Sequence, residues 1–222
     1  MRKTFAAVVI AALIAGTAQA QDSTPLLQRI RIATISSATP AKTADWYRKW
    51  LGYRVAETGK VSASLAKSWN APRSAGKPYS ILASVGTPDV FIRVVGIDPV
   101  PGFKADTTYG WNSIEIIVDD LDKLAKEMKA GDVHFGREMA ALDPPFASIH
   151  AMQVHGTAEE VVNLASETGD RTKSNLPIPK SQVDRIFLIS GAGTDVDALR
   201  NYWVDTFKMN PFQRFRSEEH TS

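Results

Sequence analysis

The sequence contains no cysteine, and this absence excludes several kinds of chemistry at once. There can be no disulfide, no thiolate nucleophile and no cysteine-ligated metal. A long apolar run is lacking too, because the ten residues of Phe5–Ile14 are too few to span a bilayer. An excess of charge is also lacking: apart from Arg2 and Lys3, 24 basic residues balance 24 acidic ones. Neither a nucleic-acid partner nor an anionic membrane surface is therefore expected.

The first twenty residues have the pattern of a secretory signal peptide. Arg2 and Lys3 form a charged start, Phe5–Ile14 an apolar core, and Ala18–Ala20 a small-residue cleavage site. We therefore expect residues 1–20 to be a signal peptide and the protein to be periplasmic or secreted. After cleavage no membrane partner is expected. A short N-terminal membrane anchor is the alternative.

One segment of the chain occurs twice, at an offset of 156 residues. Residues 28–53 (QRIRIATISSATPAKTADWYRKWLGY) align without a gap with residues 184–209 (DRIFLISGAGTDVDALRNYWVDTFKM). The aromatic pair of the first copy corresponds to that of the second, and all four side chains are expected in the core: Trp46, Tyr47, Tyr202 and Trp203. A repeat of this length predicts duplicated supersecondary units.

Each complete unit reads as a strand, a helix and three further strands. In the first unit the strand lies near residues 30–35, and the helix begins after Thr39 and ends at Gly52. The sequence thus predicts an α+β fold of tandem βαβββ modules. The expected boundaries are modules at 27–97 and 111–166, which form one domain over 27–166, then a linker at 167–181 and a truncated unit at 182–215.

The third unit is expected to be incomplete, since residues 182–215 supply only a strand and a helix. The helix stripe Val196, Leu199, Trp203 and Phe207 then has no sheet to cover it, so we expect this segment to be poorly folded. Residues 216–222 (RSEEHTS) are abruptly polar, and one reading frame of a widely used sequencing adapter encodes this heptapeptide. We interpret them as a non-native tail. A natural polar tail is the alternative.

Two strings carry a resemblance to a known family: DWYRKWLGYRV at 45–55 and IEIIVDDLDKLAKEMKAGDVHF at 114–135. They resemble the helix end and a module opening in the vicinal oxygen chelate superfamily. That superfamily includes glyoxalase I, bleomycin-resistance proteins, extradiol dioxygenases and fosfomycin-resistance enzymes. The resemblance covers nearly all of residues 27–215. It implies that two modules pair and that their curved sheets enclose a ligand cup.

In the metal-using members, a His on the first strand and a Glu on the last strand of a module bind a divalent ion. In this chain those positions hold other residues: Arg29, Arg31 or Ile32, then Arg93, Ser113, Asn163 and Arg185. Arginine stays protonated and cannot ligate a metal. We therefore expect no metal and no other cofactor in these modules. A divalent metal is expected only if further C-terminal modules supply its ligands.

Strand alternation shows which side chains replace the metal ligands. If the polar faces line the cup, it contains Arg29, Arg31, Arg93, Ser113, Glu115 and Asn163. Trp69, in the long loop of the first unit, is a candidate lid. Guanidinium groups in a cup suit an anionic or oxygen-rich small ligand. The alternative is that Arg and Glu pair with each other or face solvent, and that Trp69 packs its loop onto the sheet.

Among the histidines, His155 is the best candidate for a general base, because it could reach the cup rim near Asn163. His150 and His155 lie five residues apart on one predicted strand, so they face opposite sides and cannot share one ion. His134 is expected at the surface.

Three functions follow from these expectations. The first is an exported, metal-free protein that binds a small ligand. The second is a metal-dependent lyase or dioxygenase whose metal site lies in further C-terminal modules. The third is a non-catalytic structural or dimerisation domain. A homodimer is left open.

Overall fold

The structure is a computed structural model that describes residues 26–209. The predicted signal peptide (1–20) and tail (216–222) lie outside the described residues. The first module consists of β1 (Ile32–Ser37), α1 (Pro40–Leu51), β2 (Arg54–Lys60), α2 (Ala63–Ser68), a short 3-10 turn (Pro72–Ser74), β3 (Pro78–Ala83) and β4 (Phe91–Gly96). The second consists of β5 (Gly110–Val118), α3 (Leu121–Lys129), β6 (His134–Ala141), β7 (Ile149–His155) and β8 (Val161–Glu167). Then follow β9 (Val183–Ala192) and α4 (Val196–Phe207).

The two modules have the same topology. The first sheet has the order β1-β4-β3-β2, and the second continues the equivalent order β5-β8-β7-β6 with β9 on its outer edge. In each module the first strand runs parallel to the last, β1 beside β4 and β5 beside β8. The tandem βαβββ prediction is therefore confirmed, apart from the additional helix α2 in the first module.

The sequence predicts that the third unit has no sheet to complete. In the structure, however, its strand has a partner. β9 pairs antiparallel with β5 along most of its length, from Val183 opposite Val118 to Ala192 opposite Gly110. Val183 and Ile186 are buried by this pairing. The expectation that the whole third segment is poorly folded is thus wrong for β9, because the edge of β5 was open to receive it.

Local signals explain where the helices begin and end. α1 follows Thr39, has Pro40 in its first turn, and ends at Gly52, whose φ of 63° is the left-handed geometry that glycine adopts readily. The side chain of Asp120 accepts a hydrogen bond from the Lys123 N–H and so begins α3. The helix α2 was missed because its residues read as a polar loop. It is started by Ser62, whose hydroxyl accepts from the Leu65 N–H.

The main core cluster includes residues of both modules and of β9. Trp46 and Tyr47 of α1 belong to it, as predicted, with 7% and 0% of their surface exposed. Where α1 approaches the end of α3, a Cβ added to Gly131 would lie 2.0 Å from the Trp50 ring. The two modules therefore pack closely through α1, and glycine is required at that contact.

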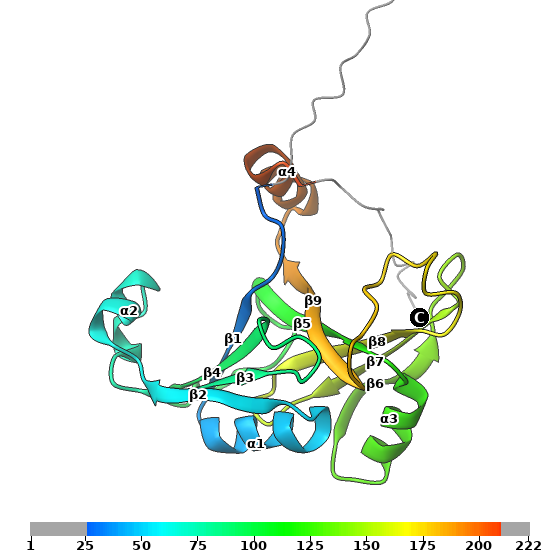
Figure 1. Cartoon of the computed structure of the whole chain (residues 1–222). Helices are drawn as coiled ribbons and strands as arrows, with labels where there is room; N and C mark the ends of the chain where they lie inside the picture. Colours follow the sequence, from blue (N-terminus) through cyan, green and yellow to red (C-terminus); the bar gives the residue numbers. More distant parts are fainter. Residues whose placement is uncertain (1–25, 210–222) are drawn as a thin grey trace, which may run out of the picture.

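The prediction that Tyr202 and Trp203 of α4 are core residues is wrong. α4 has no buried residue, and 53% of Tyr202 and 68% of Val196 are exposed. Trp203 is only partly buried, and it packs against Trp111 with ring centroids 5.7 Å apart. Figure 1 shows the reason: α4 projects away from both sheets, so no sheet covers the stripe that α1 buries in the first module.

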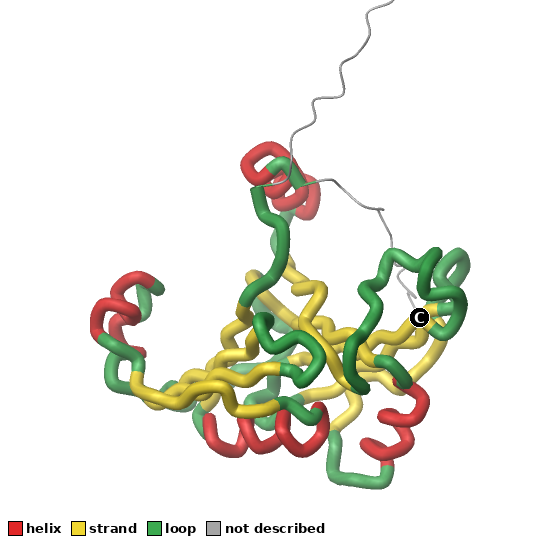
Figure 2. The backbone as a smooth tube through the Cα atoms, viewed as in Figure 1, coloured by secondary structure: helices red, strands yellow, loops and turns green. Residues whose placement is uncertain are grey.

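Two long segments lack helix and strand, residues 97–109 and 168–182, and are drawn as loops in Figure 2. The first joins the modules and the second leads into β9. Within residues 26–209, no helix is long and apolar enough to cross a membrane.

Candidate ligand-binding site

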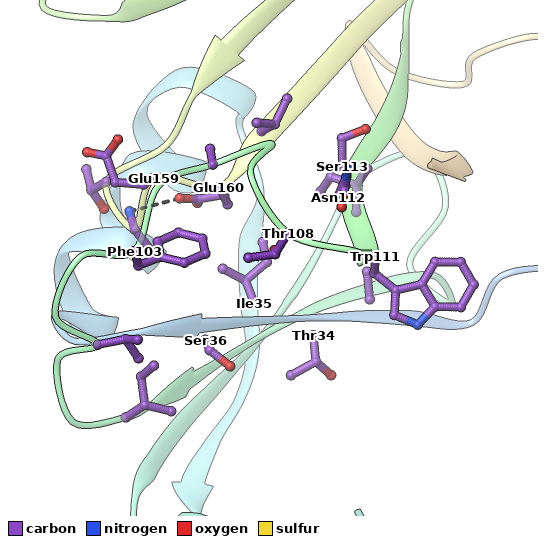
Figure 3. Close-up of a pocket in the computed structure, with 18 of the residues that line it drawn as sticks. Thr34, Ile35, Ser36, Phe103, Thr108, Trp111, Asn112, Ser113, Glu159 and Glu160 are labelled. Carbon is purple, nitrogen blue, oxygen red and sulfur yellow. Dashed lines mark hydrogen bonds between the residues drawn. The ribbon is translucent and has the colours of Figure 1, made fainter. Parts of the chain in front are cut away.

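A cleft of about 950 Å³ lies between β1, the loop that joins the modules, and the turn between β7 and β8. Figure 3 shows β1 passing along it, with Phe103 and Glu160 towards one end and Trp111 at the other. Both faces of β1 line the cleft. This is possible because β1 pairs only with β4, so that its second edge is free of strand partners in the described chain.

The residues of β1 alternate between buried and exposed positions. Ala33 and Ile35 are buried, whereas Thr34 and Ser36 are exposed. Figure 3 shows Thr34 and Ser36 on the opposite side of the strand from Ile35. An edge strand also presents unpaired N–H and C=O groups. The cleft therefore has hydroxyl and peptide groups on one wall.

The carboxyl group of Glu160 lies on the wall formed by the β7–β8 turn. Glu160 Oε2 accepts a hydrogen bond of 2.8 Å from the Ala158 N–H. The turn is closed by the Gly156 N–H, which donates to the Glu160 carbonyl at 2.9 Å. The side chain folds back over Gly156 so closely that a Cβ there would lie 2.2 Å from Glu160 Oε1. Glycine at 156 therefore makes the room that the carboxyl group occupies.

This carboxyl group is desolvated beside a buried tyrosine. Burial raises the pKa of Glu160 above its usual range, and hydrogen bonding to backbone N–H groups opposes part of the rise. Burial and the neighbouring Glu160 charge also raise the pKa of Tyr47. Glu160 Oε1 and the Tyr47 hydroxyl are both buried, and the interaction between the two side chains lowers the pKa of Glu160 and raises that of Tyr47. A buried carboxyl group beside a buried tyrosine is unusual at a turn, and such shifted pKa values often mark functional sites.

The remaining lining is aromatic, apolar and acidic. Phe103 and Trp111 line the cleft and are 49% and 68% exposed. Three carboxylates line it, from Asp106, Glu159 and Glu160, whereas no Lys or Arg of the described chain does so. The electrostatic character of the cleft therefore favours a neutral or cationic molecule.

The predicted cup residues do not gather in this cleft. Of them only Ser113 lines it. Arg29 and Arg31 lie before the start of β1, where both guanidinium groups donate to Oδ2 of Asp89, at 2.8 and 3.2 Å. Their side chains are more than half exposed. For Arg29 and Arg31, the structure therefore agrees with the alternative prediction, in which arginine pairs with an acidic side chain or faces solvent.

Arg93 and Trp69 are brought together on the face of the first sheet. Nε and Nη2 of Arg93 donate to Thr34 Oγ1 at 3.1 and 2.8 Å. The guanidinium carbon lies 4.2 Å from the centroid of the Trp69 ring. Trp69 also packs against a small cluster of Val61, Ala66 and Val95. The indole thus holds its loop on the sheet and covers Arg93 at the same time.

Ser113 and Asn163 form a chain of hydrogen bonds across the second sheet. Asn163 Nδ2 donates to Ser113 Oγ at 3.0 Å, and Gln153 Nε2 donates to Asn163 Oδ1 at 3.2 Å. Glu115 lies next to Asn163 in the strand register. Burial raises the pKa of the Glu115 carboxyl group. The register predicted for these three residues is therefore present, although only Ser113 reaches the cleft.

His155 stacks on His134, with ring centroids 4.6 Å apart and an interplanar angle of 20°. Its Nδ1 is buried and has no hydrogen-bond partner in the described chain. His150, on the same strand, is bonded through Nδ1 to Asp122 Oδ2 at 2.9 Å. His134 is exposed, as expected. His155 lies outside the cleft lining, and its role as a general base stays a prediction.

The residues that the resemblance places at metal-ligand positions make contacts of other kinds. Arg93 lies in register with Thr34, and Ser113 is hydrogen-bonded to Asn163. Guanidinium groups, a hydroxyl and an amide at these positions are not the imidazole and carboxylate donors that a divalent ion prefers. No group of three or more His, Asp or Glu side chains that could hold an ion occurs within residues 26–209.

Sequence reasoning missed the residues that dominate the cleft. The sequence predicts Tyr47 only as a core ring and does not single out Glu160, Phe103 or Trp111. One sequence pattern could have indicated Glu160: a glycine, Gly156, directly follows a predicted strand, and an acidic residue follows that glycine four positions later. The partner that gives this acid its environment, Tyr47, lies in the other module.

The strand and helix order of both modules is that of the vicinal oxygen chelate fold. Among solved structures, similarity is found to a variant of glyoxalase I from Zea mays, at 16% identity and a TM-score of 0.47, over 62% of this chain and 44% of that one. A glyoxalase family protein from Bacillus cereus is 12% identical, with a TM-score of 0.47, over 67% of this chain and 99% of that one. The fosfomycin resistance protein of Listeria monocytogenes is 11% identical, with a TM-score of 0.40, over 67% and 97%.

The matched region thus spans less than half of the maize enzyme's length. No protein-family model matches the sequence, and no curated protein matches it. The likeness concerns the fold alone.

Proposed function

We propose that this domain binds a small, oxygen-rich organic molecule in the cleft beside β1, and that the molecule is neutral or cationic. The observation that carries the proposal is the composition of the cleft wall: three carboxylates, no basic side chain, and two exposed aromatic rings. Aromatic faces bind planar or apolar groups, and desolvated carboxylates attract a positive charge. The size of the cleft, about 950 Å³, suits a ligand of drug-like dimensions.

Glu160 is the residue that would select the ligand. One oxygen of its carboxyl group accepts from the Ala158 N–H, and the carboxyl group is buried beside the Tyr47 hydroxyl. A ligand that donates a hydrogen bond, or that carries a positive charge, would add an interaction with this desolvated group. The hydroxyls of Thr34 and Ser36 and the amide of Asn112 would provide further polar contacts.

The proposal requires no metal, since the donors present do not suit one. The signal-peptide pattern of residues 1–20 supports the further proposal that binding takes place in the periplasm or outside the cell. Such a protein would sequester or sense a molecule that it meets outside the cytoplasm. Binding is the part that can be tested directly.

The test is titration of the full-length protein with three fluorescent or absorbing probes of different charge. Berberine is a planar cation with ether oxygens, quercetin is neutral and rich in hydroxyls, and anilinonaphthalene sulfonate is an anion. We expect the first two to bind and the sulfonate to bind at least about tenfold more weakly. Phe103→Ala should weaken binding roughly tenfold, because aromatic contact area is lost. Glu160→Gln should weaken berberine more than quercetin.

Tyr109→Ala is the matched control. Tyr109 is an exposed aromatic residue of the same segment, and it does not line the cleft. This variant should bind all three probes as the unmodified protein does. Preference for the sulfonate, or binding that is indifferent to Phe103→Ala and Glu160→Gln, would contradict the proposal.

A further inference from the structure

A second cleft, of about 650 Å³, lies where the chain approaches β1, beside the β3–β4 loop and the segment that leads into β9. Three cationic side chains line it, from Arg29, Lys180 and Arg185, together with one carboxylate, Asp89. None of these residues lines the first cleft. The two clefts of this chain therefore have opposite electrostatic character.

The carboxylates near this cleft do not neutralise its cations. Asp89 Oδ2 is shared between Arg29 and Arg31, at 2.8 and 3.2 Å. Asp184 Oδ2 lies 3.3 Å from Nη1 of Arg185. The Lys180 ammonium has no ion-pair partner in the described chain. With four cationic groups and two carboxylates in the cluster, a net charge of +2 remains.

A buried hydroxyl in the same cleft also lacks a partner. Thr87 lines the cleft, is only 9% exposed, and its Oγ1 has no hydrogen-bond partner in the described chain. Its backbone is fixed, because its N–H donates to Ser84 Oγ at 3.0 Å. A buried hydroxyl that is held in place and unsatisfied is a donor for a ligand atom.

The walls of the cleft are held together before any ligand binds. Oδ1 of Asp184 accepts from Ser84 Oγ at 2.9 Å, and Oδ2 accepts from the Lys180 N–H at 3.0 Å. A Cβ on Gly86 would lie only 2.8 Å from the Lys180 carbonyl carbon, so the β3–β4 loop and the 180–184 segment touch. Preorganised walls reduce the ordering cost of binding.

We propose that this second cleft binds a small multivalent oxyanion that carries carboxylate or phosphate groups. The guanidinium groups of Arg29 and Arg185 provide planar pairs of donors, and Lys180 provides a mobile point charge. The hydroxyl of Thr87 donates a further hydrogen bond. The site is separate from the proposed ligand cleft, so each can fail without the other.

Isothermal titration calorimetry of the full-length protein tests the proposal, with inorganic phosphate and citrate as separate probes at constant ionic strength. We expect at least one probe to bind with a dissociation constant below about 10 mM. Binding of phosphate alone identifies a phosphate site, and binding of citrate alone identifies a carboxylate site. If neither probe binds, the proposal is wrong.

Two variants locate the binding. Lys180→Gln removes an exposed charge and should weaken the probe roughly tenfold. Thr87→Val keeps the side-chain shape, removes the unpartnered hydroxyl, and should weaken the probe roughly threefold to tenfold. Neither change removes a contact that holds the fold, since Lys180 is exposed and Thr87 Oγ1 has no partner in the described chain.

Lys173→Gln is the matched control, because it removes the same charge from the same segment outside the cleft. Lys173 is 83% exposed and lies 3.3 Å from Asp170. This variant should keep the affinity within about twofold. Equal weakening by Lys173→Gln and Lys180→Gln would show diffuse attraction to a basic surface and would overturn the proposal. Unchanged affinity in both Lys180→Gln and Thr87→Val would overturn it as well.

Discussion

The hydroxyl of Tyr53 donates a hydrogen bond of 2.7 Å to the backbone carbonyl of Asp184, and both residues are buried. Tyr53 is the last residue of the first copy of the sequence repeat, and Asp184 is the first residue of the second. Burial raises the pKa of Tyr53, so the hydroxyl keeps its proton and remains a donor at all physiological pH values. This bond ties the first module to the strand that extends the second sheet.

Tyr53→Phe should lower the free energy of unfolding by about 1–3 kcal/mol. The ring still fills its place, but the buried Asp184 carbonyl loses its donor. Urea denaturation followed by circular dichroism measures the change. Tyr109→Phe, at a tyrosine that is 71% exposed, is the control and should change stability by less than about 0.5 kcal/mol. Equal stability of Tyr53→Phe and the unmodified protein would show that the bond contributes nothing.

Glu160→Gln should alter how stability depends on pH. The folded-state pKa of Glu160 lies above the ordinary value of 4.5, so the folded protein holds the proton more tightly than the unfolded chain. Stability is therefore lost as the pH rises from 4.5 through the folded-state pKa, by about 1.4 kcal/mol for each unit of the rise. Glutamine cannot ionise, so the variant does not lose this stability as the pH rises. The difference in unfolding free energy between variant and unmodified protein should therefore shift in favour of the variant from pH 4.5 to pH 7.

Urea denaturation at both pH values measures this difference. Glu159→Gln, at an exposed side chain of the same turn, is the control and should keep most of the original pH dependence, because the Glu159 charge is the smallest of the causes that shift the pKa of Glu160. Glu115→Gln should change the pH dependence of stability in the same direction as Glu160→Gln, because burial raises the pKa of Glu115 too. A pH dependence that is unchanged in Glu160→Gln would mean that this carboxyl group is solvated in the folded protein.

Gly156→Ala should destabilise the protein by about 1–2 kcal/mol, because the new Cβ meets the Glu160 carboxyl group. The collision involves the end of a side chain, so truncating that side chain should remove it. In a Glu160→Ala background the cost of Gly156→Ala should therefore fall below about 0.5 kcal/mol. The double-mutant cycle is measured by urea denaturation. A cost that is equal in both backgrounds would assign it to the backbone of the turn instead.

The fold could be predicted because its determinants are local. The repeat sets the order of the elements. Helix α1 begins after Thr39, at Pro40, and ends at Gly52, and Asp120 begins α3. Alternation along β5 and β8 placed Ser113 and Asn163 on one face, and the hydrogen bond between them bears this out. These features involve residues that are near one another in sequence or on neighbouring strands of one module.

The candidate site could not be predicted in the same way, because its chemistry depends on distant partners. β1 begins at Ile32, so Arg29 and Arg31 precede it and meet Asp89, a residue of another loop. The unusual environment of Glu160 is created by burial beside Tyr47, from the other module. A single sequence contains each of these residues but not their proximity.

Arg93 and Trp69 should show a measurable coupling energy. A double-mutant cycle with Arg93→Met and Trp69→Leu isolates their interaction from the packing that each side chain makes separately. We expect about 0.5–1 kcal/mol, because the guanidinium lies over the ring but is only partly removed from water. Thermal or urea unfolding of the four proteins gives the value. Additive effects of the two substitutions would show that the two groups are merely adjacent.

β9 and α4 should differ sharply in protection from amide hydrogen exchange. β9 is hydrogen-bonded to β5 and buries Val183 and Ile186, whereas α4 buries no residue. Short helices with little tertiary packing are marginal in water, so α4, which is held mainly by Trp203 against Trp111, opens locally at little cost while β9 opens only with the sheet. Mass spectrometry of peptides after deuterium labelling should show the α4 peptides exchanging at least about a hundredfold faster than those of β9. α1 is the internal control, since it has the same repeat origin but a buried stripe that includes Trp46 and Tyr47, and it should exchange slowly. Slow exchange in α4, comparable to that of α1, would mean that its aromatic side chains are covered by a partner in solution.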